Sequence, residues 1–442
     1  MSGVSPWSLG RLQRVAIVGS GIAGLAAAHS LKGLASVTLF EAGSYFGGHT
    51  HTVDVTLPGA SGLVTHGVDT GFLVFNERTY PNLIALLEEL EVETAKSDMS
   101  FSVKVPDAMH GKGLEWSGSS LNSVFAQRSN LVNPKFLRML GDIVRFNRIT
   151  TALATSGAEA AMMQPLGDFL ITEKFSAEFR DWYFLPMMGC IWSCPTDQML
   201  QFPVATMIRF CHNHGLIQIT DRPQWWTVRG GARHYVEKII AGIADKRLNS
   251  PVASIARHAQ GVTLTSPAGQ EHFDQVIVAT HSDQALALLQ APTAAEQAVL
   301  GAIAYQPNRA VLHTDTSVLP TRKLAWAAWN YERREGEGQK PFSVCLHYLL
   351  NMLQPLPFTQ SVVVSLNPVK DIARHHIMGE FDYTHPVFDL AAIRAQRELP
   401  ALQGQQRTYF CGAWAGYGFH EDGLKSGLNA AQLLKHHTGQ PA

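Results

Sequence analysis

The sequence has few charged residues, almost no net charge and no long hydrophobic run. Charged residues make up 16% of its 442 residues, and 35 Lys and Arg are balanced by 36 Asp and Glu. No overall electric field therefore favours nucleic acid or an anionic membrane as a partner. The run of about 18 apolar residues that a bilayer-crossing helix needs is also missing. We expect no nucleic-acid partner and no transmembrane segment, and only peripheral membrane contact stays open.

Cysteine is scarce as well. The five cysteines are Cys190, Cys194, Cys211, Cys345 and Cys411. Their odd number and scattered positions argue against a disulfide framework and favour a reducing compartment. The opening stretch, MSGVSPWSLGRLQR, lacks the apolar region of a secretory signal, so we expect a cytoplasmic protein. Cys190 and Cys194 are interpreted as small buried side chains, with a redox pair as the alternative.

A glycine motif follows the first predicted strand. Val15 to Val18 form a short apolar run, which is typical of a buried parallel strand. Gly19, Gly21 and Gly24 follow in G-x-G-x-x-G spacing and lead into a helix rich in Ala and Leu. Such glycines permit a tight turn, close approach to a pyrophosphate, and packing of the helix on the strand. The N–H groups at the helix N-terminus favour phosphates, so the motif predicts a dinucleotide site.

A carboxylate and two more glycines come next. Glu41 follows Gly19 at about the 20-residue spacing from which an acid can hydrogen-bond ribose hydroxyls, which leaves FAD and NAD open. With Gly47 and Gly48 the chain resembles the FAD-containing superfamily of amine oxidases and phytoene-desaturase-like enzymes, in which a Gly-Gly turn lies against the pyrophosphate. That turn usually ends in Arg, whereas this chain has His49. The helix dipole and backbone N–H groups are then expected to contribute more to phosphate binding.

His49 and His51 also permit a second interpretation. Alternate residues of a strand face the same side, so the two imidazoles can share a metal ion. Two histidines make half of a zinc site, and no nearby Cys or Glu completes it. We predict no metal here, with metal binding kept as the alternative.

The middle of the chain gives coarser signals. Helices are expected from Tyr80 to Leu90 and over 133–185, and a strand with a glycine bend from Val68 to Phe75. KLAWAAWNYERR is expected to form a strand, and ERREGEGQK a solvated hairpin tip. Phe and Met in the helical part are interpreted as core, with the lining of a lipophilic tunnel as the alternative.

The C-terminal segment TYFCGAWAGYGFHEDGLKSGL is the second diagnostic pattern. A strand is expected to end at Gly412, and a helix to begin at about Gly423. In the resembling flavoenzymes this strand–turn–helix unit closes over the flavin. The resemblance places Asp422 and Gly423 at positions that contact the ribityl chain and ring.

The resemblance extends over the whole chain and implies its organisation. We expect an α/β fold, with a Rossmann-like FAD-binding domain of the amine-oxidase or glutathione-reductase type and an interleaved α+β substrate domain. The predicted FAD-binding domain comprises residues 1–78, 228–305 and 401–442, and the predicted substrate-binding domain comprises residues 79–227 and 306–400. The residues expected to contact FAD are Gly19, Ser20, Gly21, Ile22, Ala23, Gly24, Glu41, Ala42, Gly47, Gly48, His49, Thr70, Gly71, Val252, Thr280, Gly412, Glu421, Asp422, Gly423 and Leu424.

A narrower resemblance bears on the substrate. FGGHTHTV, VDTGFLVFNERTYPNL, WAAWNY and GYGFHEDGLKSGL resemble a bacterial subgroup of NAD/FAD-binding proteins related to flavin-dependent fatty-acid isomerases. That subgroup is often associated with lipid methyltransferases of the cyclopropane-synthase type. The resemblance therefore implies a lipophilic substrate such as a fatty acyl chain, and a lipid methyltransferase as a partner.

The expected reaction is hydride transfer to the flavin. The sequence has one dinucleotide motif, whereas a disulfide-reductase type of enzyme needs a second one for a nicotinamide. The protein would supply orientation and a dry pocket while a fatty acyl chain is desaturated or isomerised. A flavin-containing amine oxidase and a non-catalytic flavin-bearing partner of a lipid methyltransferase are the alternatives. Trp414 and Phe419 can wall the pocket together with Tyr417. Tyr417, His420 and Glu421 are candidates for catalysis.

Overall fold

The computed structural model describes residues 12–156, 164–192, 196–213, 223–333 and 345–438. Backbone contacts divide the chain into two compact units. Unit 1 consists of Met1–Gly48, Tyr235–Ile303 and Arg394–Ala442, and unit 2 of His49–His234 and Ala304–Ile393. Within the described ranges, no helix combines the length and the apolar character needed to cross a membrane.

The units differ from the predicted domains in the placement of several segments, of which residues 49–78 are the longest. Residues 49–78 were predicted to lie in the FAD-binding domain, but their contacts place them in unit 2. Thr359 N–H donates to Pro58 O at 2.9 Å, and Asp69 N–H donates to Gln354 Oε1 at 3.1 Å, so this segment is bonded to residues of unit 2. Residues 228–234 also belong to unit 2, and residues 394–400 to unit 1. Which ligand each unit holds stays a prediction.

A parallel sheet forms the centre of unit 1. Its strands lie in the order β10-β2-β1-β14-β20 and every neighbouring pair is parallel. They are β1 (Gln13–Val18), β2 (Ala35–Phe40), β10 (Asp245–Arg247), β14 (Gln275–Val278) and β20 (Thr408–Phe410). Val15, Ala16 and Ile17 are fully buried, as expected for the central strand of a parallel sheet. The predicted first strand is therefore confirmed, and strands from both ends of the chain share one sheet.

Helices and a small antiparallel sheet complete unit 1. The antiparallel strands are β11 (Ser254–His258), β12 (Gly261–Ser266) and β13 (Gly269–Phe273). The helices are α1 (Ile22–Ser30), α12 (Arg233–Ala241), which begins in unit 2, α13 (Ser282–Leu288), α14 (Ala294–Leu300), α16 (Leu390–Glu398), which also begins in unit 2, η6 (Leu399–Leu402), η7 (Gln405–Arg407), η8 (Ala413–Ala415) and α17 (His420–His437).

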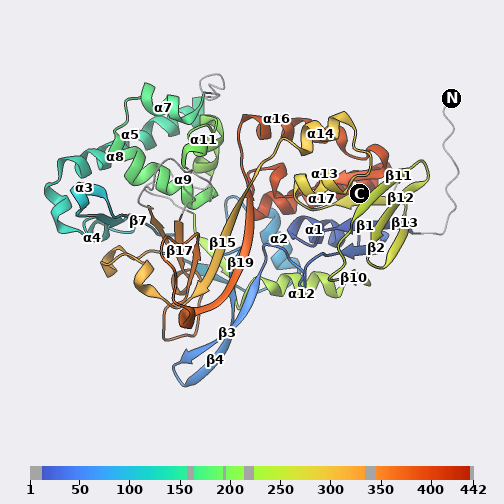
Figure 1. Cartoon of the computed structure of the whole chain (residues 1–442), viewed down its shortest axis with the longest axis horizontal. Helices are drawn as coiled ribbons and strands as arrows, with labels where there is room; N and C mark the ends of the chain where they lie inside the picture. Colours follow the sequence, from blue (N-terminus) through green and yellow to red (C-terminus); the bar gives the residue numbers. More distant parts are fainter. Residues whose placement is uncertain (1–11, 157–163, 193–195, 214–222, 334–344, 439–442) are drawn as a thin grey trace. The chain divides into compact units, whose positions relative to one another are not determined.

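Helices α1 and α17, from opposite ends of the sequence, pack directly on each other (Figure 1). A Cβ added to Gly427 would lie 2.0 Å from Ala23 O, and one added to Gly423 would lie 2.7 Å from Ile22 Cγ2. Any larger side chain at these glycines would push the helices apart. At Gly427 the backbone of α17 therefore packs directly against the backbone of the N-terminal glycine motif, with no side chain between them.

The described residues of unit 2 form a seven-stranded sheet in the order β19-β15-β18-β17-β16-β7-β8. These strands are β7 (Phe101–Val105), β8 (Leu114–Ser117), β15 (Tyr305–His313), β16 (Trp329–Glu332), β17 (Cys345–Leu349), β18 (Val363–Leu366) and β19 (Ile377–Pro386). Smaller sheets are formed by β3 (Thr52–Gly59) with β4 (Gly62–Asp69), and by β5 (Phe75–Asn76), β9 (Trp225–Val228) and β6 (Thr94–Ser97). Figure 1 shows β15 and β19 as a long antiparallel pair.

The helices of unit 2 bury a cluster of phenylalanines. The helices are α2 (Pro81–Glu89), α3 (Ala108–Gly111), α4 (Leu121–Val124), η1 (Arg128–Val132), α5 (Pro134–Ser156), α7 (Leu166–Thr172), α8 (Ala177–Phe179), η2 (Arg180–Phe184), α9 (Leu185–Trp192), α10 (Thr196–Met199), α11 (Val204–Asn213), η3 (Thr316–Val318), η4 (Lys323–Ala325), α15 (Leu350–Leu353) and η5 (Arg374–His376). Phe146, Phe179 and Phe184 are fully buried, and their ring centroids lie 5.0 to 5.7 Å apart. The rings contact one another, as expected for core packing.

Three local predictions need correction. The predicted strand from Val68 to Phe75 is interrupted, because β4 ends at Asp69 and Phe72 N–H donates to His49 O at 2.8 Å. The predicted strand KLAWAAWNYERR begins as the 3-10 turn η4 and becomes a strand only at Trp329. The charged hairpin tip was placed too early, since Glu332 is a buried residue of β16; residues 334–340 lie outside the described residues.

Candidate functional site

The glycine motif leaves open space at the N-terminus of α1. A Cβ on Gly24 would lie 2.0 Å from Gly19 O, and Gly19 itself has a φ of +101°. These two glycines are required by the fold. Gly21 is different, because an added Cβ there would meet no atom within 4 Å. Gly21 is also the N-cap of α1, which has no side-chain cap, so its first N–H groups suit an anion in the open space.

Glu41 is fixed beside this turn by three hydrogen bonds. Its carboxylate accepts from Ser20 N–H at 3.0 Å, from the Ser20 hydroxyl at 2.5 Å and from Gly43 N–H at 2.8 Å. The backbone N–H of Ser250 donates to Glu41 O at 2.8 Å, which brings the segment of Val252 to the same place. Val252 is buried, and Ala42 is exposed. The acid therefore lies at the carboxyl end of β2, where the sequence predicted it.

The Gly-Gly turn closes onto the glycine motif. Gly47 N–H donates to Ser20 O at 3.1 Å, and Ser20 is fully buried. A Cβ on Gly48 would lie 3.2 Å from Gly21 Cα, and Gly48 has a φ of +58°. The structure thus brings the two glycine motifs into contact, and the contact of this turn with a pyrophosphate stays a prediction.

The C-terminal turn joins the same end of the parallel sheet. The Trp414 indole N–H donates to Thr280 O at 3.0 Å. A Cβ on Gly412 would lie 2.3 Å from Trp414 Nε1, and one on Gly423 would touch Ile22 on α1. Trp414 is buried, so it holds the turn against β14. Gly412, Thr280 and Gly423 are therefore brought to the N-terminus of α1, and the predicted helix begins at His420 rather than at about Gly423.

Two titratable groups lie buried in the first turn of α17. Burial lowers the pKa of His420 to about 3, and its Nε2 lies 2.6 Å from the Tyr235 hydroxyl. Burial raises the pKa of Asp422 to about 6, although its carboxylate accepts from Phe419 N–H at 3.0 Å. At neutral pH the His420 imidazole is therefore uncharged, and it cannot act as a cationic general acid. The proposed catalytic roles of Tyr417, His420 and Glu421 stay predictions. Leu424 is buried one residue beyond Gly423.

The other predicted residues lie together in unit 2. A Cβ on Gly71 would lie 2.3 Å from His49 O. The Thr70 hydroxyl lies 2.7 Å from the Tyr383 hydroxyl, and His51 Nδ1 lies 3.0 Å from that same hydroxyl. Burial lowers the pKa of His51.

Tyr383 was missed by the sequence analysis. Its ring centroid lies 5.1 Å from that of His49, and its hydroxyl lies within hydrogen-bonding distance of Thr70 and His51. Tyr383 therefore contacts two residues that were predicted to bind FAD, His49 and Thr70. The signal was the alternation of aromatic residues in FDYTH, which marks a strand with Phe381 and Tyr383 on one face. That strand, β19, had not been predicted.

The chain is similar to flavoproteins over most of its length. Residues 22–355 match the family described as flavin containing amine oxidoreductase. "Putative flavin-containing monoamine oxidase AofH" of Mycobacterium tuberculosis is 27% identical over 289 residues, which cover 62% of this chain and 57% of that protein. The match therefore spans less than two thirds of that relative's length.

Solved structures share the fold. A fatty acid isomerase from P. acnes that produces CLA has a TM-score of 0.66 at 16% identity, covering 97% of this chain and 99% of that one. Cyclohexylamine oxidase from Brevibacterium oxydans has a TM-score of 0.69 at 16% identity, covering 97% and 100%. At this identity the likeness concerns the fold alone.

The protein belongs to the flavin containing amine oxidoreductase family. Its cofactor is FAD, and the predicted fold class is confirmed. The geometry of unit 1 fits this cofactor. The open space at Gly21 beside an uncapped helix suits a pyrophosphate, and the Glu41 carboxylate suits ribose hydroxyls.

Proposed function

We propose that this FAD-dependent oxidoreductase acts on a fatty acyl or related lipid chain, which it desaturates or isomerises. The observation that supports a lipid over an amine is the pairing of the buried carboxylates in unit 2. A protonated amine that leaves water needs a counter-charge or an aromatic cage. The buried carboxylates in the part of unit 2 that the structure describes already have protein donors.

These carboxylates and their donors are Asp69 with Thr52, Ala232 N–H and Gln354; Glu115 with Thr321 N–H and Arg322; Asp142 with Ser176 and Arg145; and Glu332 with Lys104 and His347. Releasing Asp69, Asp142 or Glu332 to bind an ammonium would leave a buried donor unpaired. That loss costs about 1–3 kcal/mol for each group. A neutral lipid chain needs no such exchange.

The interior of unit 2 is compatible with an apolar substrate. Its helices are rich in Phe and Met, and the rings of Phe146, Phe179 and Phe184 form a wholly apolar cluster. The fold itself does not choose the substrate, because one solved neighbour is named a fatty acid isomerase and another an amine oxidase. The proposal therefore depends on the paired carboxylates and on the resemblance to the isomerase-related subgroup.

The residues of unit 1 have defined tasks in this proposal. FAD, when bound, supplies the hydride acceptor. The N-terminus of α1 and the space at Gly21 bind the pyrophosphate, and Glu41 orients the ribose. His420 adds no positive charge, because burial keeps its pKa at about 3. Isomerisation returns both electrons to the same lipid, whereas desaturation passes them to oxygen or to a carrier.

Anaerobic mixing of the purified holoenzyme with two panels of compounds tests this proposal. One panel holds unsaturated fatty acids and phospholipids, and the other holds primary and secondary amines. We expect the lipids to bleach the flavin, or to leave it oxidised while mass spectrometry finds a shifted double bond. Bleaching by amines alone would overturn the lipid proposal. Inertness towards both panels would instead favour the non-catalytic alternative, and co-purification with a lipid methyltransferase then tests the proposed partner.

A further inference from the structure

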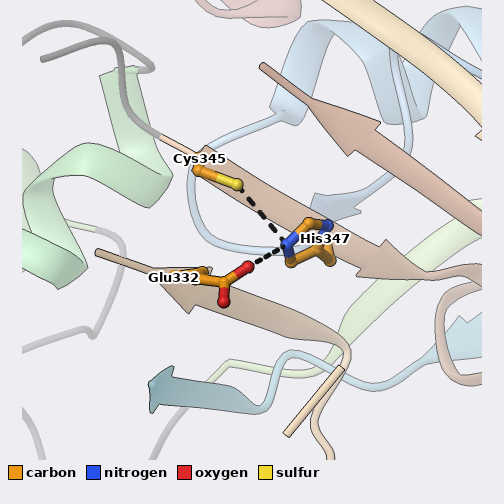
Figure 2. A group of neighbouring side chains, drawn as sticks. All are labelled: Glu332, Cys345 and His347. Atoms are coloured by element: carbon orange, nitrogen blue, oxygen red, sulfur yellow. Dashed lines mark hydrogen bonds and ion pairs between the residues drawn. The ribbon is translucent and has the colours of Figure 1, made fainter. Parts of the chain in front are cut away.

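Three metal-ligating side chains converge in the large sheet of unit 2. Strands β16 and β17 are antiparallel neighbours, and Glu332 pairs directly with Cys345. Cys345 and His347 are two residues apart on β17, so their side chains face the same side of the sheet. Figure 2 shows Glu332, Cys345 and His347 pointing toward one another. None of the three was assigned a role by the sequence analysis.

The distances between the donor atoms suit one metal ion. His347 Nε2 lies 3.2 Å from Glu332 Oε2 and 3.4 Å from Cys345 Sγ, and all three donor atoms lie within 4.8 Å of one another. Ligands placed tetrahedrally around zinc, with metal–ligand bonds of about 2.0 to 2.3 Å, lie about 3.3 to 3.7 Å apart. The two distances from His347 Nε2 therefore match those between zinc ligands, and the third distance lies within 4.8 Å.

His347 Nε2 is the point at which the three donor atoms meet. His347 Nε2 carries at most one hydrogen, yet it faces both a carboxylate oxygen and a sulfur atom. All three residues are buried, with 5% exposure for Glu332 and 1% for each of the other two, so water offers little compensation. A divalent cation bonded to the three atoms would satisfy them all at once.

The surrounding side chains hold the ligands in place. His347 Nδ1 lies 2.6 Å from the Ser365 hydroxyl, which lies 2.7 Å from His313 Nε2. Lys104 Nζ bonds Glu332 Oε1 at 2.9 Å and so leaves Oε2 facing the other two ligands. Metal-binding histidines typically use their second nitrogen in this way, which fixes the orientation of the ring.

We propose that Glu332, Cys345 and His347 form a buried site for a divalent transition metal of the zinc class. A thiolate and an imidazole select zinc or cobalt over magnesium and calcium. The metal would join β16 to β17, with a fourth position left for another ligand. Binding would displace the thiol proton of Cys345, which leaves for solvent. His347 would bind through Nε2 without a hydrogen, with its ring hydrogen on Nδ1 facing the Ser365 hydroxyl. All three ligands belong to unit 2. In this site Glu332 Oε2 and His347 Nε2 bind the metal instead of each other, and the metal then pairs the Glu332 carboxylate that supports the lipid proposal.

The holoenzyme tests this proposal directly. Protein purified without added chelator is expected to contain about one zinc per chain by elemental analysis. After exchange for cobalt, the difference spectrum against FAD-loaded Cys345→Ser protein should show thiolate-to-cobalt charge transfer. A protein that keeps neither zinc nor cobalt after both are supplied, or that shows no such band, would overturn the site.

Single variants locate the ligands. Cys345→Ser, His347→Gln and Glu332→Gln should each weaken metal binding by at least about tenfold. Cys211→Ser is the matched control, because Cys211 is a fully buried thiol of α11 in the same unit but outside the group. Equal metal loss in Cys211→Ser would contradict the assignment. If the Cys345 variant does not fold, the cobalt spectrum of the unaltered protein, referenced to its zinc form, decides the question.

Discussion

Unit 1 and unit 2 use different means to hold polar groups inside the molecule. At its glycine motif, unit 1 relies on short segments, in which Ser20 and Gly43 donate hydrogen bonds to Glu41 and the N-terminus of α1 has no side-chain cap. Unit 2 relies on side chains far apart in sequence, such as Asp69 with Gln354 at 2.6 Å. The first arrangement leaves backbone groups for a ligand, whereas the second uses its polar groups within the protein. A ligand motif is therefore readable only in the first.

The largest effect is expected at the buried ion pair Arg257–Glu296, which shows that unit 1 also holds polar side chains inside the protein. Both side chains are buried, with 3% and 2% exposure, and Glu296 also accepts from Thr293 N–H at 2.7 Å to cap α14. Glu296→Ala leaves a buried guanidinium without its counter-charge. We expect the free energy of unfolding to fall by about 3–5 kcal/mol. Denaturant unfolding measures this free energy. A decrease of less than about 1 kcal/mol, which is typical of a surface ion pair, would contradict the expectation.

Replacement of Glu41 tests the local arrangement as a ligand site. Glu41→Ala removes the carboxylate predicted to bind ribose, and we expect FAD affinity to fall by about 3 kcal/mol, or roughly a hundredfold. Fluorescence of released flavin during titration gives the dissociation constant. Glu88→Ala, at an exposed position of α2 in unit 2, is the control and should keep the original affinity. Unchanged binding in Glu41→Ala would remove this acid from the site.

Asp422 and Asp69 allow a comparison by pH, because burial raises the pKa of each to about 6 from an ordinary 3.8. Between these values the folded protein binds more protons than the unfolded chain, so stability falls as pH rises from about 4 to about 6. Each group accounts for up to about 3 kcal/mol.

Asp422→Asn should remove its share of this loss, because an amide does not ionise and still accepts from Phe419 N–H. Asp69→Asn should instead destabilise unit 2, because its amide hydrogens would face the donors Ala232 N–H and Gln354. Melting temperatures on both sides of the window test both expectations. Parallel pH curves for the unaltered protein and Asp422→Asn would contradict the first.

Replacing two helical glycines by alanine compares a site of close helix packing with a site of open space. Gly427→Ala on α17 would place a Cβ 2.0 Å from Ala23 O, so we expect a loss of about 1–3 kcal/mol and weaker FAD retention. Gly141 lies in α5 of unit 2, and a Cβ there would meet nothing within 4 Å. Gly141→Ala should be neutral or stabilise by up to about 1 kcal/mol. Similar thermal shifts in the two variants would count against the close crossing of α1 and α17.

The smallest effect is expected at the surface of unit 2. Arg309 and Glu380 form an ion pair at 2.7 Å, but their side chains are 49% and 48% exposed. A double-mutant cycle with alanine at both positions should give a coupling of about 0.2–1 kcal/mol, which added salt reduces. A coupling of about 3 kcal/mol or more, as large as the loss expected for Glu296→Ala, would show that exposure does not explain why the two ion pairs differ in stabilising energy.

Much of unit 1 could be predicted from the sequence because its signals are local. The order of strand, glycine turn, helix and acid from Val15 to Glu41 appears in the structure as predicted. The strands of unit 2 were harder to predict. The sequence analysis predicted neither the hairpin of β3 and β4 nor the strands β15 and β19. Residues 49–78 fall in unit 2 rather than with the other segments of the predicted FAD-binding domain, because their partners, including Gln354, lie far along the chain.

The sequence by itself determined the family, the cofactor and the strand–glycine turn–helix unit at the start of unit 1, because glycines and a single acid at fixed spacing leave the backbone few alternatives. Only the tertiary structure decided which distant side chains meet. Lys104, Glu332, His347, Ser365 and His313 come from five neighbouring strands and form one line across the sheet of unit 2. Strand pairing sets that line, and pairing between distant segments depends on the burial of the whole sheet rather than on any short motif.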